Sequence, residues 1–102
     1  MPNPKDVAYS QAVHAEKERL FGLSDADLLA LPDYSAAERT VAAVQLSVGV
    51  YHQSHEDGFE VFVAQAKRQI FLGYGHMFVE GFILRRDGSR DALPDQVFYE
   101  YA

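Results

Sequence analysis

The spacing of apolar residues divides the chain into a helical first part and a β-rich remainder. Asn3 and Pro4, followed by Asp6, form a helix start, with an Asn cap, proline at the first helical position and a carboxylate in the first turn. This helix is predicted to end near residue 21, before Gly22, with residues 16–19 on its solvated side. Its expected apolar face consists of Tyr9, Ala12, Val13 and Leu20.

A second helix is predicted over 25–31. Ser24 and Asp27 have the spacing of a capping box, and Leu23 and Leu28 have that of a hydrophobic staple. Ser35 and Glu38 repeat the capping-box spacing, which predicts a further helical turn from Ala36.

The region 36–54 fits two templates. Even positions in its second half are aliphatic and alternate with polar or small residues, as in a half-buried strand, but a helix template also matches. Valine content and a glycine favour the strand. The alternating positions are Val44, Leu46, Val48 and Val50.

The same ambiguity recurs over 55–72. A helix is consistent with the apolar spacing, yet Phe59 to Val63 directly follows Asp57 and Gly58, a favoured hairpin turn. We therefore expect a strand here as well. Gly58→Val is expected to be costly if Gly58 has a positive φ.

The C-terminal part predicts a last hairpin, 77–86 with 96–101, around the turn at Asp87 and Gly88. The predicted fold is α+β, with N-terminal helices packed on one face of a mainly antiparallel β-meander sheet. A single domain is expected over 1–102, with a helical segment at about 4–38 and a sheet segment at about 41–101.

Charge and composition exclude several classes of function. The net charge of −6 disfavours nucleic acid as a partner, and the absence of cysteine excludes disulfides and thiolate metal sites. The opening residues lack a signal-peptide pattern, and the apolar stretch 70–84 is too short and too interrupted for a membrane span. We expect a cytoplasmic protein with no membrane partner and no cofactor.

Two histidines, His52 and His55, invite a metal interpretation. Side chains three residues apart share a face on a helix but not on a strand, so the predicted strand argues against chelation. We expect no metal site, with this pair as the weaker alternative.

Three further groups are weak candidates for a site. Glu80 shares a strand face with apolar neighbours and, with the nearby His76, offers acid–base chemistry. Tyr74 lies between Gly73 and Gly75, where backbone can approach an anion. With Tyr74, the candidate ligand-binding residues are Arg85 and Arg86, which begin the last predicted turn.

Aromatic residues are concentrated late in the chain, with ten of thirteen after position 50. A core this small cannot bury all of them, and a final strand holding Phe98, Tyr99 and Tyr101 would present aromatic rings on both faces. These three residues are therefore the expected interface of a homodimer.

The sequence favours a non-catalytic binding or protein-interaction module. One alternative is a small enzyme or ligand-binding protein with an aromatic groove around His76 and Glu80. Another is an acidic regulator of a basic partner protein, acting through a patch that contains Asp25, Asp27 and Asp33.

Overall fold

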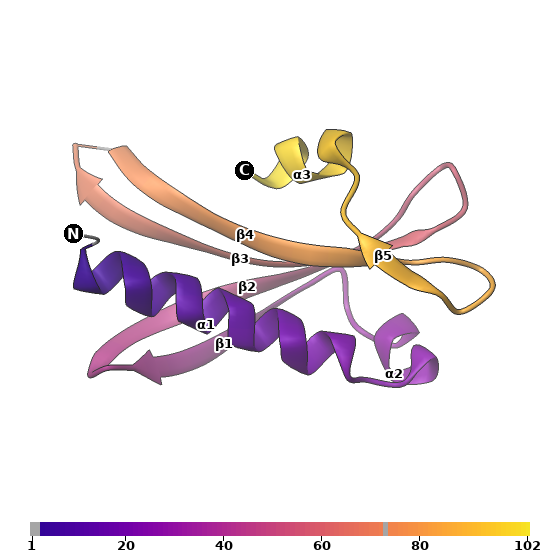
Figure 1. Cartoon of the computed structure of the whole chain (residues 1–102), viewed down its shortest axis with the longest axis horizontal. Coiled ribbons are helices and arrows are strands. Elements are labelled where there is room, and N and C mark those ends of the chain that lie inside the picture. The colour runs from indigo at the N-terminus through magenta and orange to yellow at the C-terminus, as the bar shows by residue number, and fades with distance from the viewer. Residues whose placement is uncertain (1–2, 73) are drawn as a thin grey trace.

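The computed structural model describes residues 3–72 and 74–102. A long helix lies along one face of a curved antiparallel sheet, and a short C-terminal helix lies against the other face (Figure 1). The strands follow one another in the order β1-β2-β3-β4-β5, so the predicted α+β meander is confirmed. The elements are α1 (Pro4–Phe21), α2 (Asp25–Leu29), β1 (Tyr34–Val41), β2 (Val44–Ser54), β3 (Glu60–Phe71), β4 (Tyr74–Leu84), β5 (Arg90–Ala92) and α3 (Asp95–Tyr101).

Both N-terminal helices begin as their capping residues predict. The Asn3 side chain accepts a hydrogen bond from the backbone N–H of Lys5 at 2.8 Å, and α1 ends at Gly22. The Ser24 hydroxyl accepts from the backbone N–H of Asp27 at 3.1 Å, which caps α2. These side chains satisfy N–H groups that have no partner within the first helical turn.

Strand β1 replaces the helical turn predicted from Ala36, so the helical segment does not extend to residue 38. Every residue of β1 pairs with β2, from Tyr34 opposite Tyr51 to Val41 opposite Val44. The capping-box spacing of Ser35 and Glu38 was misleading because ladder hydrogen bonds along a whole strand outweigh one local cap.

The turn between β1 and β2 explains why this hairpin has no sequence signature. Ala42 and Ala43 both have positive φ, 50° and 64°, as the two central residues of a type I′ turn require. Asparagine and glycine are the usual residues there, because a Cβ makes this conformation costly. Pairing of the flanking strands holds the two alanines in it.

Two further hairpins use one common turn geometry. In each, a glycine with positive φ donates its own backbone N–H to the carbonyl three residues earlier: Gly58 (φ 94°) to His55 and Gly88 (φ 87°) to Arg85. The predicted turn at Asp57 and Gly58, and the strands on either side of it, are confirmed. Sequence patterns that carry Asp-Gly therefore located two turns that the Ala-Ala pair could not.

The predicted C-terminal strand is wrong. Residues 95–101 form helix α3, and the partner of β4 after the turn is the three-residue strand β5. Pro94 occupies the N-cap position and Asp95 the first turn, while Val97 is buried against the sheet. As a helix, this segment buries Val97 and brings Tyr101, four residues later, to the same side. The alternation of residues that suggested a strand was therefore misleading.

The core lies mainly between α1 and the sheet. Phe62 and Phe82 stack at 5.4 Å and are essentially buried beneath Leu20 and Leu28. The opposite face has a smaller cluster in which Val97 of α3 packs on β3 and β4. We call these the helix face and the outer face of the sheet.

Glu16, expected on the solvated side of α1, is buried, with its side chain 1% exposed. Arg19 donates to one carboxylate oxygen at 2.9 and 2.6 Å, and Arg39 of β1 donates to the other at 3.0 and 2.7 Å. The ion cluster ties α1 to β1. Burial raises the pKa of the Glu16 carboxyl. The hydrogen bonds and charges of the two guanidiniums lower it by more, so the pKa lies below its ordinary range.

Candidate functional site

His76 and Glu80 both project from the helix face of β4, but they do not form one site. The His76 ring contacts Asp6 at 3.4 Å, whereas Glu80 binds His14 Nδ1 at 2.8 Å, a helix residue two turns further along. Arg68 also binds Asp6 at 2.5 Å. Each side chain therefore holds α1 against the sheet, and of the two only Glu80 lines the groove beside β4.

Asp6 is the acidic member of the first of these contacts. Its hydrogen bond from Arg68 lowers the pKa of the carboxyl more than burial raises it, and the charges of Arg68 and His76 lower it further. The group is held ionised, as a structural ion pair requires.

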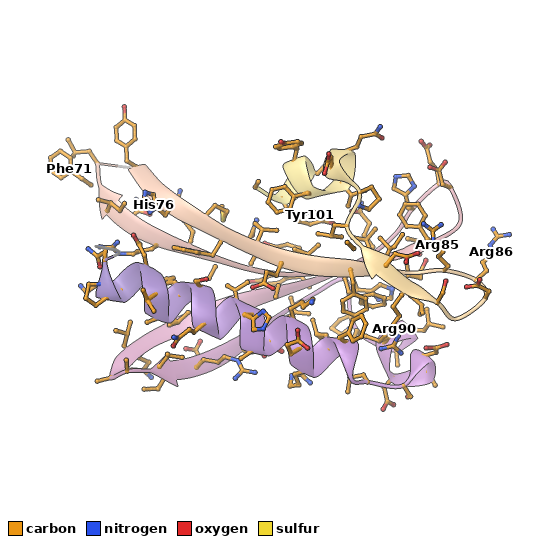
Figure 2. The ribbon with its side chains drawn as sticks, viewed as in Figure 1. Phe71, His76, Arg85, Arg86, Arg90 and Tyr101 are labelled. Atoms are coloured by element: carbon orange, nitrogen blue, oxygen red, sulfur yellow. The ribbon has the colours of Figure 1, made fainter. Side chains whose placement is uncertain are left out.

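The predicted ligand-binding residues lie at opposite ends of the molecule. Tyr74 is 77% exposed at the far end of the β3–β4 hairpin, while Arg85 and Arg86 stand in the turn after β4 (Figure 2). Gly73 lies outside the described residues. Arg85 binds Asp91 at 2.5 Å, and both arginines line a cavity of about 460 Å³ against α2.

His52 and His55 do not share a metal-binding position. His52 stacks on Phe62, and its two ring nitrogens lie 2.9 Å from the Leu31 carbonyl and 2.9 Å from Glu60. The His55 ring stacks instead on Phe59 and accepts a hydrogen bond from the Asp57 N–H. Within residues 3–72 and 74–102, no three His, Asp or Glu side chains cluster as metal ligands would.

Ser54, Glu60 and His52 form a short polar chain that resembles catalytic machinery only in its composition. The Ser54 hydroxyl donates to Glu60 at 2.8 Å, and Glu60 in turn meets His52. A nucleophilic serine needs the histidine beside it as a base, but here the carboxylate stands between them. The arrangement fixes the end of the β2–β3 hairpin to the segment before β1.

The three aromatic residues expected at an interface all lie on α3, where the ring centroids of Phe98 and Tyr99 are 5.7 Å apart. Phe98 faces the edge of β4, Tyr99 is 74% exposed, and Tyr101 lies over the outer face near Tyr51, with ring centroids 5.5 Å apart. Burial, and then the charge of Glu100 and the neighbouring Tyr51, raise the pKa of the Tyr101 hydroxyl. This hydroxyl is therefore a neutral donor, and it bonds Gln53 at 2.7 Å.

The free edge of β4 is the feature that the sequence analysis missed. Strand β5 pairs only with 82–84, so no described residue forms a ladder with the outer edge over 75–81. The predicted strand at 96–101 would have covered this edge. Because that segment is a helix, the edge stays open.

A groove of about 320 Å³ runs along this edge. Its walls come from α1 and α3, and its floor is β4 itself. The lining residues are Ser10, Val13, Met77, Phe78, Val79, Glu80 and Phe98. An unpaired strand between two flanking helices has the geometry of a receptor for an added strand.

The two free edges of the sheet differ in chemistry. Between residues 75 and 81, β4 has no lysine, arginine or proline, and its one acid is Glu80. Strand β1, at the other edge, carries the charged residues Glu38 and Arg39. Proteins commonly protect an edge with charge or proline, so the β4 edge is the unprotected one.

No described helix is long and apolar enough to cross a membrane. Comparisons with models of protein families, with curated proteins and with solved structures found no match to this chain.

Proposed function

We propose that this protein is a non-catalytic interaction module that forms a homodimer by pairing the β4 edges of two copies. The observation that carries the proposal is the open, unprotected edge over 75–81 in its groove. Strand addition supplies main-chain hydrogen bonds along the whole edge, and the groove supplies contacts for side chains.

A second copy of the chain fits this edge. Antiparallel pairing about a two-fold axis at Phe78, the midpoint of 75–81, uses the entire free stretch. It places Met77 opposite Val79 and His76 opposite Glu80 of the other copy. A histidine and a carboxylate directly across two strands can hydrogen-bond, and the symmetry repeats the contact.

Exposed apolar residues at the end of the β3–β4 hairpin agree with this arrangement. Phe71 is directed away from the sheet at the far end of the molecule (Figure 2). In this register Tyr74 falls opposite Phe82 of the other copy, where the ladder with β5 begins, so the hairpin end meets β5. The exposed residues at the hairpin end are Ile70 at 49%, Phe71 at 67%, Leu72 at 82%, Tyr74 at 77% and Met77 at 40%.

The backbone direction identifies a selective substitution. Arg85 N–H bonds Ser89 across the β4–β5 turn, so the backbone groups of Met77 and Val79, at even separations from Arg85, point to the same outer edge. Proline at position 79 removes one outward N–H and leaves the β3–β4 ladder its donors.

Sedimentation velocity at micromolar concentration tests the proposal. We expect a species of twice the 11.4 kDa chain mass, converted to monomer by Met77→Lys and by Val79→Pro. Thr40→Lys, on the exposed side of β1, is the matched control and should remain dimeric. Circular dichroism confirms that each variant is folded.

A monomeric wild-type protein at several hundred micromolar would refute the proposal. So would folded Met77→Lys and Val79→Pro variants that remain dimers, because a different surface would then hold the copies together. The expected cytoplasmic location remains a prediction, and fractionation of cells that produce the protein would check it.

A further inference from the structure

Three tyrosine rings lie together on the outer face. Tyr34 opens β1, Tyr51 lies opposite it on β2, and Tyr101 ends α3. The ring centroids of Tyr34 and Tyr51 are 5.0 Å apart, and those of Tyr51 and Tyr101 are 5.5 Å apart. The rings form a continuous aromatic surface across two strands and a helix.

Gly49 makes room for this surface. A Cβ at that position would lie 3.1 Å from the Tyr34 ring and 3.3 Å from the Tyr51 ring. Both distances are tighter than ordinary van der Waals contact, so a side chain there would displace one ring. The glycine allows the two tyrosines to lie close to the sheet.

Asp33 supplies a carboxylate beside the rings. Its backbone carbonyl accepts a hydrogen bond from the His52 N–H at 3.0 Å, which fixes the residue at the edge of β2. The residue is exposed, and among the described residues it has no ion-pair partner. It thus differs from Asp25, which binds Arg90 at 2.8 Å.

Asp33, Tyr51 and Tyr101 line a single cavity of about 570 Å³. Its lining contains no lysine or arginine, and the His52 ring is already engaged by Leu31 and Glu60. The lining residues are Asp33, Tyr51, His52, Gln53, Ser54 and Tyr101. The unmatched chemistry of this cavity is one negative charge next to aromatic faces.

We propose that this cavity binds the guanidinium group of an arginine side chain presented by a partner polypeptide. A cation is attracted to the face of a tyrosine ring, and a planar guanidinium also stacks on it. Asp33 accepts two parallel N–H bonds from the same group. The net charge of −6 favours the approach of a basic partner. Lysine fits less well, because its ammonium is more strongly hydrated and has no flat face.

The probe is the peptide acetyl-Gly-Arg-Gly amide, titrated into isotope-labelled full-length protein and followed by amide chemical shifts. We expect saturable shifts centred on residues 33, 34, 51 and 101. The counterpart with citrulline has the same shape without the charge and should bind about tenfold or more weakly. The lysine counterpart should bind several-fold more weakly than the arginine peptide.

Variants assign the effect to this cavity. Asp33→Asn and Tyr101→Ala should each weaken binding by about fivefold or more, because they remove the carboxylate and one ring face of the cavity lining. Asp27→Asn and Tyr99→Ala are matched controls, an exposed acid and an exposed tyrosine elsewhere, and should leave binding within about twofold. The amide spectra also show whether each variant is folded.

The proposal is overturned if the citrulline peptide binds as tightly as the arginine peptide. It is equally overturned if Asp27→Asn weakens binding as much as Asp33→Asn, since general charge attraction would then explain the result. An absence of localised shifts at millimolar peptide would refute it as well. These outcomes do not depend on the β4 edge, which is a separate surface.

Discussion

Replacing Glu16 by glutamine should be among the most destabilising single-atom changes in this protein. The carboxylate is buried and accepts four guanidinium hydrogen bonds, two on each oxygen. Glutamine keeps one acceptor oxygen and turns an NH₂ group toward the other guanidinium. That guanidinium loses both of its hydrogen bonds to residue 16 and faces the NH₂ donor of the glutamine. No negative charge remains to compensate it.

The magnitude follows from the exposure of the two arginines. Removing one partner of a fully buried ion pair costs roughly 3–5 kcal/mol. Arg39 is 29% exposed and Arg19 is 51% exposed, so water recovers part of this loss. We expect a decrease in the free energy of unfolding of about 2–3 kcal/mol, and a fall in Tm of about 10–20 °C.

Urea unfolding followed by circular dichroism measures this change, with Glu18→Gln as the control on the same helix. Glu18 is 53% exposed and its ion pairs are with His14 and Lys17, so its loss should cost less than about 0.5 kcal/mol. If Glu16→Gln and Glu18→Gln lower stability equally, the cluster does not hold α1 to β1 and the reasoning fails.

Acid pH provides an independent arm of the same experiment. The folded-state pKa of Glu16 is depressed, so its contribution is fully present above the unfolded-state value of about 4.3 and is lost as the pH falls through the folded-state value. The stability gap between wild type and Glu16→Gln should therefore be full at pH 7 and smaller at pH 3. Carboxylates present in both proteins cancel in this comparison. A gap that does not change with pH would contradict the assigned ionisation.

Two further predictions concern the backbone. Changing Ala42 to asparagine and Ala43 to glycine should raise the free energy of unfolding, measured in urea, by about 1 kcal/mol. Asparagine and glycine adopt the positive φ angles of this turn at lower cost than alanine. A loss of stability would show that the turn is not type I′. Gly81→Ala should lower the free energy of unfolding by about 1–3 kcal/mol, because the new Cβ would come closer than 3.0 Å to the Phe62 carbonyl oxygen. Gly22→Ala is the control and should change stability little, because its Cβ would lie 3.6 Å from its nearest neighbour. Equal effects of the two variants would refute the close approach at Gly81.

Local signals in the sequence were sufficient where the backbone and side chain act within a few residues. The caps at Asn3 and Ser24, the stop at Gly22 and the Asp57-Gly58 turn are all of this kind. Strand β1 could not be found in this way, because its turn uses alanines and its stability comes from pairing with β2. Local sequence signals predict where an element begins and ends. Pairing with a strand that is distant in the sequence can outweigh those signals.

The surroundings of the candidate residues could not be predicted for a related reason. Glu16 lies in a run of charged residues, and only the approach of Arg39 from β1, 23 positions later, explains its burial. Tyr34 and Tyr51 become neighbours only through the β1–β2 register, which requires β1 to be known. His76 and Glu80 lie on one face of β4, but α1 supplies a separate partner to each. The contacts of a side chain depend on which helix or strand packs against it in the fold.

Helix α3 connects the two proposed surfaces. Its Phe98 lines the groove at the β4 edge, while Tyr101 lines the cavity beside Asp33, so one short helix forms a wall of each. Strand β3 lies between Tyr51 on β2 and the β4 edge, so pairing of two β4 strands would leave both cavities uncovered. A homodimer would present two arginine-binding cavities in fixed relation. Binding at one cavity then raises the effective concentration of a second arginine on the same partner, so that two individually weak contacts hold a basic chain firmly.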